Sequence, residues 1–368
     1  MRDGKKYVHP SQGIFLVWFF SILAFALCAA ALKGGRILAL HFGFADKPGG
    51  RKKHDNPVPP IGGLAILPVF FGLAWIAGYK DIVPWPLIAG VAALLIMGTI
   101  DEARTIRPYI KFAIMIWTAC FVVIFGEAQI GNLGDLFGFG PVELQWMSKG
   151  FTVLCLALLM NAINMMDGID GLAGGFCALV AFWFLIVCTA TGQWAYVGVF
   201  GILLGTLLGF LAFNMRAPWR SSASVFLGDA GSLCLGLLLG WFSIRLTQMP
   251  SAPLEPITVI WIIAIPVMDA FALFIARSIR GLHPFNADRR HLHHRFIDAG
   301  LSPARTTTAI LGLIALCAVI GFAAEAQKVP AVFLFALWMV LFTLHTIGIA
   351  HPRGYTMFTR FLRARKRS

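Results

Sequence analysis

The chain has 368 residues, of which 58% are hydrophobic and only 13% are charged. Soluble domains carry about 25% charged residues, so this composition excludes a soluble two-domain enzyme and indicates a membrane protein. Lysine and arginine number 30 against 17 aspartates and glutamates, and we interpret this excess as a signal of membrane orientation rather than of nucleic-acid binding.

About eleven apolar segments follow one another along the chain, each near the roughly 20 residues that cross about 30 Å of hydrocarbon. They predict an all-α fold: a polytopic transmembrane helical bundle in one domain, residues 1–368, with an active site in a cleft at its cytoplasmic face. The expected spans lie near residues 14–33, 61–79, 85–100, 112–126, 150–163, 172–190, 195–213, 230–247, 257–276, 307–325 and 330–349.

Positive charge predicts the orientation. When loops are assigned alternately to the two sides, most lysines and arginines fall in one set, which the positive-inside rule places in the cytoplasm. The N-terminus is then periplasmic and the C-terminus cytoplasmic. The expected cytoplasmic segments are residues 34–60, 101–111, 164–171, 214–229, 277–306 and the tail 350–368. No internal repeat is evident, which weakens the reading as an inverted-repeat transporter.

The first cytoplasmic loop, DKPGGRKKHDNPVPPIGG, places cations among prolines and glycines that prevent a regular helix. Arg51 and His54 are its candidate anion-binding residues. A plain cytosolic linker is the alternative. In the second loop, Asp101 and Glu102 end the third span and Lys111 follows. Both carboxylates can reach one aqueous site from a helix end, although an interfacial cap with snorkelling cations would also explain them.

The segment NAINMMDGIDGLAGG interrupts apolar sequence with two asparagines and two aspartates. Asn161 and Asn164 are three residues apart, as are Asp167 and Asp170, so each pair can share a helix face. Four such groups at a membrane boundary, with no cation in their own loop, are costly unless positive charge is supplied. This pattern predicts Mg²⁺, or Mn²⁺ in its place. Interhelical hydrogen bonding with capping is the alternative.

The segment FNMRAPWRSSASVFLGDAGS places Asp229 directly before the eighth span. An acid at a helix entrance is ordinarily an N-cap, but beside the other loops Asp229 becomes a candidate metal ligand. Phe226 offers a flat surface suited to stacking on a base.

The last polar loop is the most cationic internal segment and ends in HLHH. Its His291, His293 and His294 make a weak zinc signature, because no cysteine or second cluster accompanies them. Arg289 and Arg290 favour phosphate binding instead, since guanidinium groups bind phosphate in a bidentate way. Attraction to anionic lipid headgroups is the alternative explanation for Arg277 and Arg280. Together the loops predict a membrane enzyme that handles a nucleotide diphosphate.

Over nearly its whole length the sequence resembles the polyprenyl-phosphate N-acetylhexosamine-1-phosphate transferase family. Five motifs carry the resemblance in order: DKPGGRKKH, DEARTIRPYIK, NAINMMDGIDGLAGG, FLGDAGS and HPFNADRRHLHH. NMRAPWR before FLGDAGS makes it most similar to the bacterial undecaprenyl-phosphate N-acetylglucosamine-1-phosphate transferases that begin O-antigen or enterobacterial common antigen. Enzymes that begin teichoic acid are close behind.

The resemblance implies a bacterial inner-membrane enzyme that joins UDP-N-acetylglucosamine to undecaprenyl phosphate and releases UMP, with Mg²⁺ as cofactor. It implies metal ligation by Asn164 and Asp229. It also implies that Asp101 is the leading catalytic carboxylate, that Lys111 contacts a phosphate, and that Asp167 and Asp170 are acids needed for activity. Phe226 would stack on the uracil and Asn214 would contact the nucleoside. The histidine motif near the sugar and diphosphate would be His291, His293 and His294.

Two positions depart from the family pattern. Glu102 stands where a second aspartate is usual, and Pro60 where a polar residue is common. The expected partners are a UDP-sugar, undecaprenyl phosphate and membrane lipid, without nucleic acid, and a homodimer is compatible with the sequence. Two rival functions remain. One is a flippase for an anionic lipid. The other is that of the muramyl-pentapeptide transferases, whose usual triple-histidine motif is not matched by HLHH in this sequence.

Overall fold

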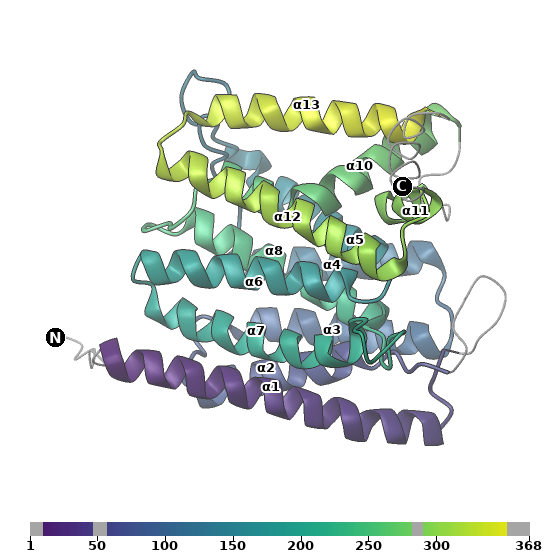
Figure 1. Ribbon diagram of the computed structural model, residues 1–368. Helices are drawn as coiled ribbons and strands as arrows, with labels where there is room; N and C mark the ends of the chain where they lie inside the picture. The colour runs from purple at the N-terminus through teal and green to yellow at the C-terminus, as the bar shows by residue number, and fades with distance from the viewer. Residues whose placement is uncertain (1–9, 47–56, 282–289, 352–368) are drawn as a thin grey trace.

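The computed structural model describes residues 10–46, 57–281 and 290–351, and within them it confirms the all-α fold (Figure 1). Strand pairing in these residues is limited to isolated bridges. The helices are α1 (Pro10–His41), α2 (Gly62–Ile76), α3 (Trp85–Ala103), α4 (Pro108–Phe125), η1 (Gln145–Met147), α5 (Ser148–Met166), α6 (Leu172–Ala190), α7 (Trp194–Asn214), α8 (Gly228–Gln248), α9 (Pro256–Ile262), α10 (Ala264–Ile279), α11 (Leu292–Asp298), α12 (Pro303–Ala326) and α13 (Ala331–Ala350).

Nine described helices are long and apolar enough to cross a membrane, and the count reaches ten if a bent pair is one span. The bent pair is α9 and α10, which meet at 77° where the sequence predicted one span near 257–276. The segment expected to span near 61–79 forms α2, an apolar helix of 15 residues with Pro68 inside it. Each of the eleven expected segments therefore contains a helix, but α2 is shorter than expected, the segment near 257–276 is bent, and the short helices η1 and α11 were not expected.

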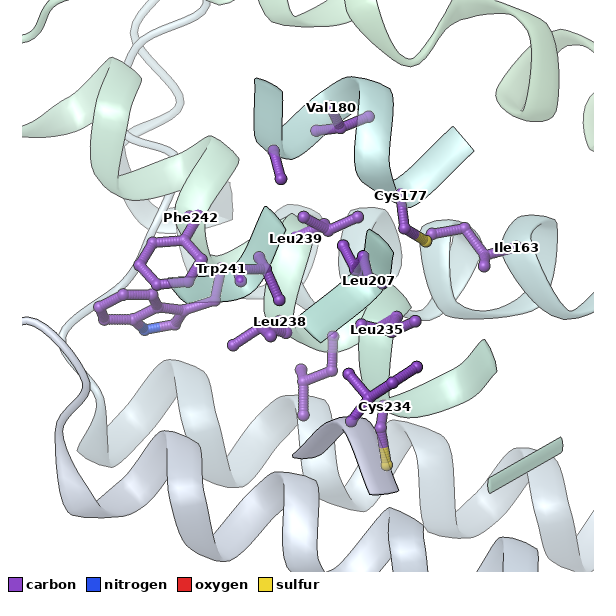
Figure 2. Packing of buried hydrophobic residues seen from close by; sticks show 14 of the residues in the cluster. Ile163, Cys177, Val180, Leu207, Cys234, Leu235, Leu238, Leu239, Trp241 and Phe242 are labelled. Carbon is purple, nitrogen blue, oxygen red and sulfur yellow. The ribbon is translucent and has the colours of Figure 1, made fainter. Parts of the chain in front are cut away.

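Helix α8 is the centre of the bundle, since 89% of its apolar stretch is buried, against 11% for α1 and 17% for α13. Figure 2 shows Leu235, Leu238 and Leu239 of α8 packed near Cys177 of α6 and Leu207 of α7. The outer helices instead expose large apolar side chains, as a multi-pass membrane protein requires.

Backbone contacts hold α8 against its neighbours. A Cβ on Gly63 of α2 would come within 2.5 Å of the Gly231 Cα, and a Cβ on Gly236 would come as close to the Met160 Cα of α5. The backbone of α3 at Gly98 likewise touches α8 at Ala230, in its first turn. Such close approach between membrane helices requires residues without side chains. It fixes the position of the first turn of α8.

The successive helices run in alternating directions, so α1 begins and α13 ends at opposite ends of the bundle (Figure 1). One end, on the right of Figure 1, gathers residues 57–61, 101–107, 167–171, 215–227 and 290–302. We call it the polar end. All of the candidate residues that the structure describes lie at or beside the polar end. The side of the membrane that the polar end faces stays a prediction.

Candidate active site

Lys111 joins two carboxylates that are far apart in the sequence. Its Nζ lies 2.5 Å from Asp101 Oδ2 and 2.5 Å from Asp229 Oδ2. Asp101 comes from the last turn of α3 and Lys111 from the first turn of α4, while Asp229 begins α8. The other Asp101 oxygen accepts the backbone N–H of Ile106 at 2.7 Å, which closes the short turn between α3 and α4. Both Asp101 oxygens are therefore engaged within the chain.

Asp229 also contacts Asn164 and Glu102. Its Oδ1 accepts a hydrogen bond from Asn164 Nδ2 at 2.9 Å, and the same Nδ2 lies 2.9 Å from Ser232 Oγ. Its backbone N–H donates to Glu102 Oε1 at 2.7 Å. Helices α3, α4, α5 and α8 thus bring together five residues that we call the carboxylate cluster: Asp101, Glu102, Lys111, Asn164 and Asp229.

Gly228 explains the glycine in the FLGDAGS motif. Its φ of +77° lies in the left-handed region, which side chains rarely adopt. A Cβ at this position would also collide with the Glu102 carboxylate and lie 3.2 Å from Pro60. The glycine therefore lets Glu102 cap the start of α8.

We expect Glu102→Asp to reduce transferase activity by about 10- to 100-fold, the scale of one lost hydrogen bond that involves a charged group. The side chain is shortened by one methylene and no longer reaches the Asp229 N–H. Glu102→Gln keeps the reach and the acceptor, so it should lose less. Steady-state kcat for the two variants tests the order, and a better Asp than Gln variant would contradict this role for Glu102.

Asp167 lies beside the carboxylate cluster at the end of α5 and accepts a hydrogen bond from the Gly228 N–H. Burial, followed by the nearby charges of Asp229 and Glu102, raises the pKa of Asp167 to about 8. The hydrogen bond opposes this rise without cancelling it. Negative charge at this end of α5 is therefore incompletely balanced by the chain itself.

The donor set fits a hard divalent cation, since carboxylate and amide oxygens with uncompensated negative charge suit Mg²⁺. In residues 10–46, 57–281 and 290–351, however, no group of three or more His, Cys, Asp or Glu is arranged as a metal site. The predicted ligands Asn164 and Asp229 are hydrogen-bonded to each other instead. Their role as ligands stays a prediction.

Asp170 and Asn214 hold the loop that precedes α8. Asp170 Oδ2 lies 2.8 Å from Arg216 Nε and accepts the Ala223 N–H at 3.0 Å. Asn214 is buried; its Oδ1 accepts the Gly171 N–H and its Nδ2 donates to the Val225 carbonyl, both at 2.9 Å. Both side chains therefore have partners within the chain that the sequence did not predict. Their predicted roles in activity and in nucleoside binding stay predictions.

The backbone of Phe226 is bonded to the segment before α2: its N–H donates to the Pro59 carbonyl at 3.0 Å and its carbonyl accepts the Gly62 N–H at 2.9 Å. These bonds place the half-buried ring at the polar end, beside the start of α2 and directly before α8. An aromatic face at this position can stack on a planar ring.

The histidine motif begins α11. His291 and His293 are buried and their rings are stacked, with centroids 5.4 Å apart. Burial, followed by the adjacent His294 and His291, lowers the pKa of His293 to about 3 against the opposing charge of Asp269. His293 is therefore a neutral ring at physiological pH, able to form hydrogen bonds but not to supply positive charge. The sequence had grouped it with cationic residues.

Gly168 connects the histidine motif to the acidic segment. A Cβ on Gly168 would come within 2.6 Å of His293 Nε2, so the ring lies directly on the glycine backbone. Asp167 precedes this glycine, and the histidines therefore approach the carboxylate cluster from the α11 side. Of the other basic candidates, Arg290 is half-buried at the start of this segment. Arg51, His54 and Arg289 lie outside the described residues.

Sequence reasoning missed Asp269 of α10. Its Oδ2 lies 3.0 Å from His291 Nδ1, and its Oδ1 accepts the Leu292 N–H at 3.0 Å. Asp269 and His293 also line a small pocket between α5, α10 and α11. A single acid inside an apolar segment was the available signal, because such residues are rare in spans and usually functional.

Comparison with known proteins agrees with this geometry. Glycosyl transferase family 4 matches residues 84–247, which include the whole carboxylate cluster. The undecaprenyl-phosphate alpha-N-acetylglucosaminyl 1-phosphate transferase of Escherichia coli (strain K12) is 30% identical over 341 residues, covering 90% of each chain. The protein of the same name from Yersinia pestis is 31% identical over 94% of both chains. That from Haemophilus influenzae is 31% identical over 90% of this chain and 93% of the relative.

The relatives cover the chain almost from end to end, so the likeness includes the α10 and α11 region beyond residues 84–247. The carboxylate cluster also lies at the polar end of the helical bundle, where a membrane enzyme meets a water-soluble substrate. The chain therefore belongs to glycosyl transferase family 4, as a multi-pass membrane enzyme of the polyprenyl-phosphate sugar-1-phosphate transferase type.

Proposed function

We propose that this protein transfers N-acetylglucosamine 1-phosphate from UDP-N-acetylglucosamine to undecaprenyl phosphate, with release of UMP. The observation that carries the proposal is the bridge from Lys111 to Asp101 and Asp229. It lies in a chain that is 30% identical to a named transferase over 90% of each chain. The product would be the first lipid-linked sugar of a cell-surface glycan such as O-antigen or enterobacterial common antigen. Transfer of another N-acetylhexosamine, or a product for teichoic acid, is the alternative.

Phosphoryl transfer depends on positioning and charge neutralisation more than on covalent help from the protein. The lipid phosphate has a second pKa near 6, so it is mostly dianionic at pH 7 and can attack the β-phosphorus directly. Lys111 supplies a cation at the meeting point of α3, α4 and α8, where a phosphate oxygen can replace one of its carboxylate partners. Asp101 then keeps the lysine in place.

We propose Mg²⁺ as the cofactor, or Mn²⁺ in its place, with Asp229 and Asn164 as its ligands. When bound, the ion supplies positive charge to the diphosphate and to the departing UMP. Asp167 lies beside these ligands; burial is the main cause of its raised pKa, and a cation bound there would favour its ionised form. Activity should therefore disappear in EDTA and return on addition of Mg²⁺.

We propose roles in binding for the other predicted residues. His291, His293 and His294 would form hydrogen bonds with the sugar and the diphosphate, and Arg51, His54, Arg289 and Arg290 would bind phosphate. We propose that Asp170 supports activity and that Asn214 contacts the nucleoside, both from the loop in which their polar atoms have partners. We also propose that the polar end faces the cytoplasm of the bacterial inner membrane, where UDP-sugars are found.

Phe226→Ala should raise the KM for the UDP-sugar by about 5- to 100-fold and leave the KM for the lipid nearly unchanged, because base stacking contributes roughly 1–3 kcal/mol. Phe226→Tyr retains an aromatic face and serves as the matched control. Steady-state kinetics with each substrate varied in turn would check this. Equal changes in both KM values would assign the ring to packing.

The deciding experiment measures UMP release by the purified protein in detergent with undecaprenyl phosphate and a panel of UDP-sugars. We expect turnover with UDP-N-acetylglucosamine and only with lipid phosphate present. Turnover with a different UDP-N-acetylhexosamine alone would select the alternative substrate. Without turnover on any of the sugars, and with protein that remains folded, the proposed reaction would be wrong.

A further inference from the structure

Asp269 occupies an unusual position for an acid. It lies in the second turn of α10, follows the 77° bend from α9, and its side chain is only 14% exposed. Charged groups in such surroundings are costly unless their oxygens are paired. Both Asp269 oxygens are paired: Oδ2 with His291, and Oδ1 with the Leu292 N–H and with His345 Nε2, at 3.0, 3.0 and 3.3 Å.

These three partners come from two other helices. His291 and Leu292 form the start of α11, and His345 belongs to α13, near the end of the described chain. Asp269 therefore connects α10, α11 and α13 at the point where the histidine motif begins. The Leu292 bond also satisfies one of the unpaired N–H groups at the start of that short helix.

The pairing with His291 has a chemical consequence. A carboxylate can only accept, so the proton between the two side chains belongs to His291 Nδ1. This fixes the tautomer and leaves Nε2 as the nitrogen available to another group. The ring plane is fixed by the same bond and by stacking on His293, whose ring lies against Gly168 beside the carboxylate cluster.

We propose that Asp269 is a positioning residue for sugar-phosphate transfer, which selects the tautomer of His291 and holds the start of α11, with His345 holding Asp269 from α13. This inference rests on the proposed function, since it assigns His291 to the substrate side. Asp269 itself does not touch substrate. Its partners within the chain account for both of its oxygens.

The first test compares Asp269→Asn with the wild-type protein. Asparagine has nearly the same shape, and its oxygen can still accept the Leu292 N–H, but its NH₂ group donates toward His291 and favours the opposite tautomer. We expect kcat to fall by about 10- to 100-fold, as when other partners that orient a catalytic histidine are removed, while KM for the lipid and the melting temperature change little. Glu325→Gln is the matched control, because Glu325 is another acid in a membrane helix that accepts a backbone N–H.

The second test separates positioning from packing. In a His291→Ala background, Asp269→Asn should cause no further loss of kcat, because the residue acts through a ring that is already absent. Losses that multiply in the double variant would overturn the proposal and leave Asp269 as a structural link between α10 and α13. His345→Gln should retain most of the activity of the wild type, and His345→Phe should lose more.

The third test does not depend on turnover. Hydrogen exchange of the peptide containing residues 290–298 should become several-fold faster in Asp269→Ala, because the Leu292 N–H loses its acceptor, and change less in Asp269→Asn. Unchanged exchange in Asp269→Ala would overturn the proposed hold on α11. If the wild-type protein transferred no sugar phosphate, the proposed function would fail while this exchange experiment still decided whether Asp269 holds the start of α11.

Discussion

Asp229→Asn is expected to reduce kcat by about 10²- to 10³-fold, the scale of losing one preorganised electrostatic contact in an active site. The asparagine retains the shape of the side chain, and the backbone N–H can still donate to Glu102. It removes the charge that Lys111 contacts at 2.5 Å and that Asn164 approaches at 2.9 Å. The variant should therefore remain folded and lose its proposed metal ligand.

Measurement of kcat across a Mg²⁺ titration would check this result, because a weakened ligand set should move half-saturation to higher Mg²⁺. Asp135→Asn is a suitable control: Asp135 also accepts backbone N–H groups, but in the loop between α4 and α5 rather than at the polar end. An Asp229→Asn variant with normal kcat and unchanged Mg²⁺ dependence would remove Asp229 from the proposed metal site.

Lys111→Met should cost at least about 10²-fold in turnover. Methionine fills a similar volume but leaves Asp101 and Asp229 facing each other without the cation between them. The repulsion is expected to separate the ends of α3 and α8, so both substrates should bind less well. Lys111→Arg restores the charge in a planar, larger form and should recover only part of the activity.

The double variant Lys111→Met, Asp101→Asn gives an internal check. Removing one of the two facing carboxylates should restore stability toward that of the wild type without restoring turnover. Thermal unfolding in detergent and UMP release would be measured on the same samples. Recovery of both properties together would mean that Lys111 acts only as a structural counter-ion.

Hydropathy alone was enough to predict the all-helical bundle, because the cost of placing backbone polar groups in lipid allows few other solutions. It could not predict the break at Ile263 between α9 and α10, or the short α2, since both depend on what packs around those segments. Apolar composition is the same for a straight helix and for two bent halves. The expected orientation depends on loop charge, which the structure does not test.

The carboxylate cluster followed from a simple rule: polar residues at alternate ends of successive spans meet at one end of the bundle. The rule could not give individual partners. The bond of Asn214 to residue 171 and that of Asp170 to Arg216 arise from loops folded on each other. Asp269 was missed because its partners, His291 and His345, are 22 and 76 residues away.

The contacts around α8 divide the site into a rigid side and an adjustable side. The first turn of α8 is held through backbone atoms that already touch α2 and α3, so it cannot shift without moving two other helices. The histidines instead stand on α11, which follows a helix that is already bent. Movement on the α11 side would therefore cost side-chain hydrogen bonds to Asp269, whereas movement of the first turn of α8 would disrupt close backbone packing.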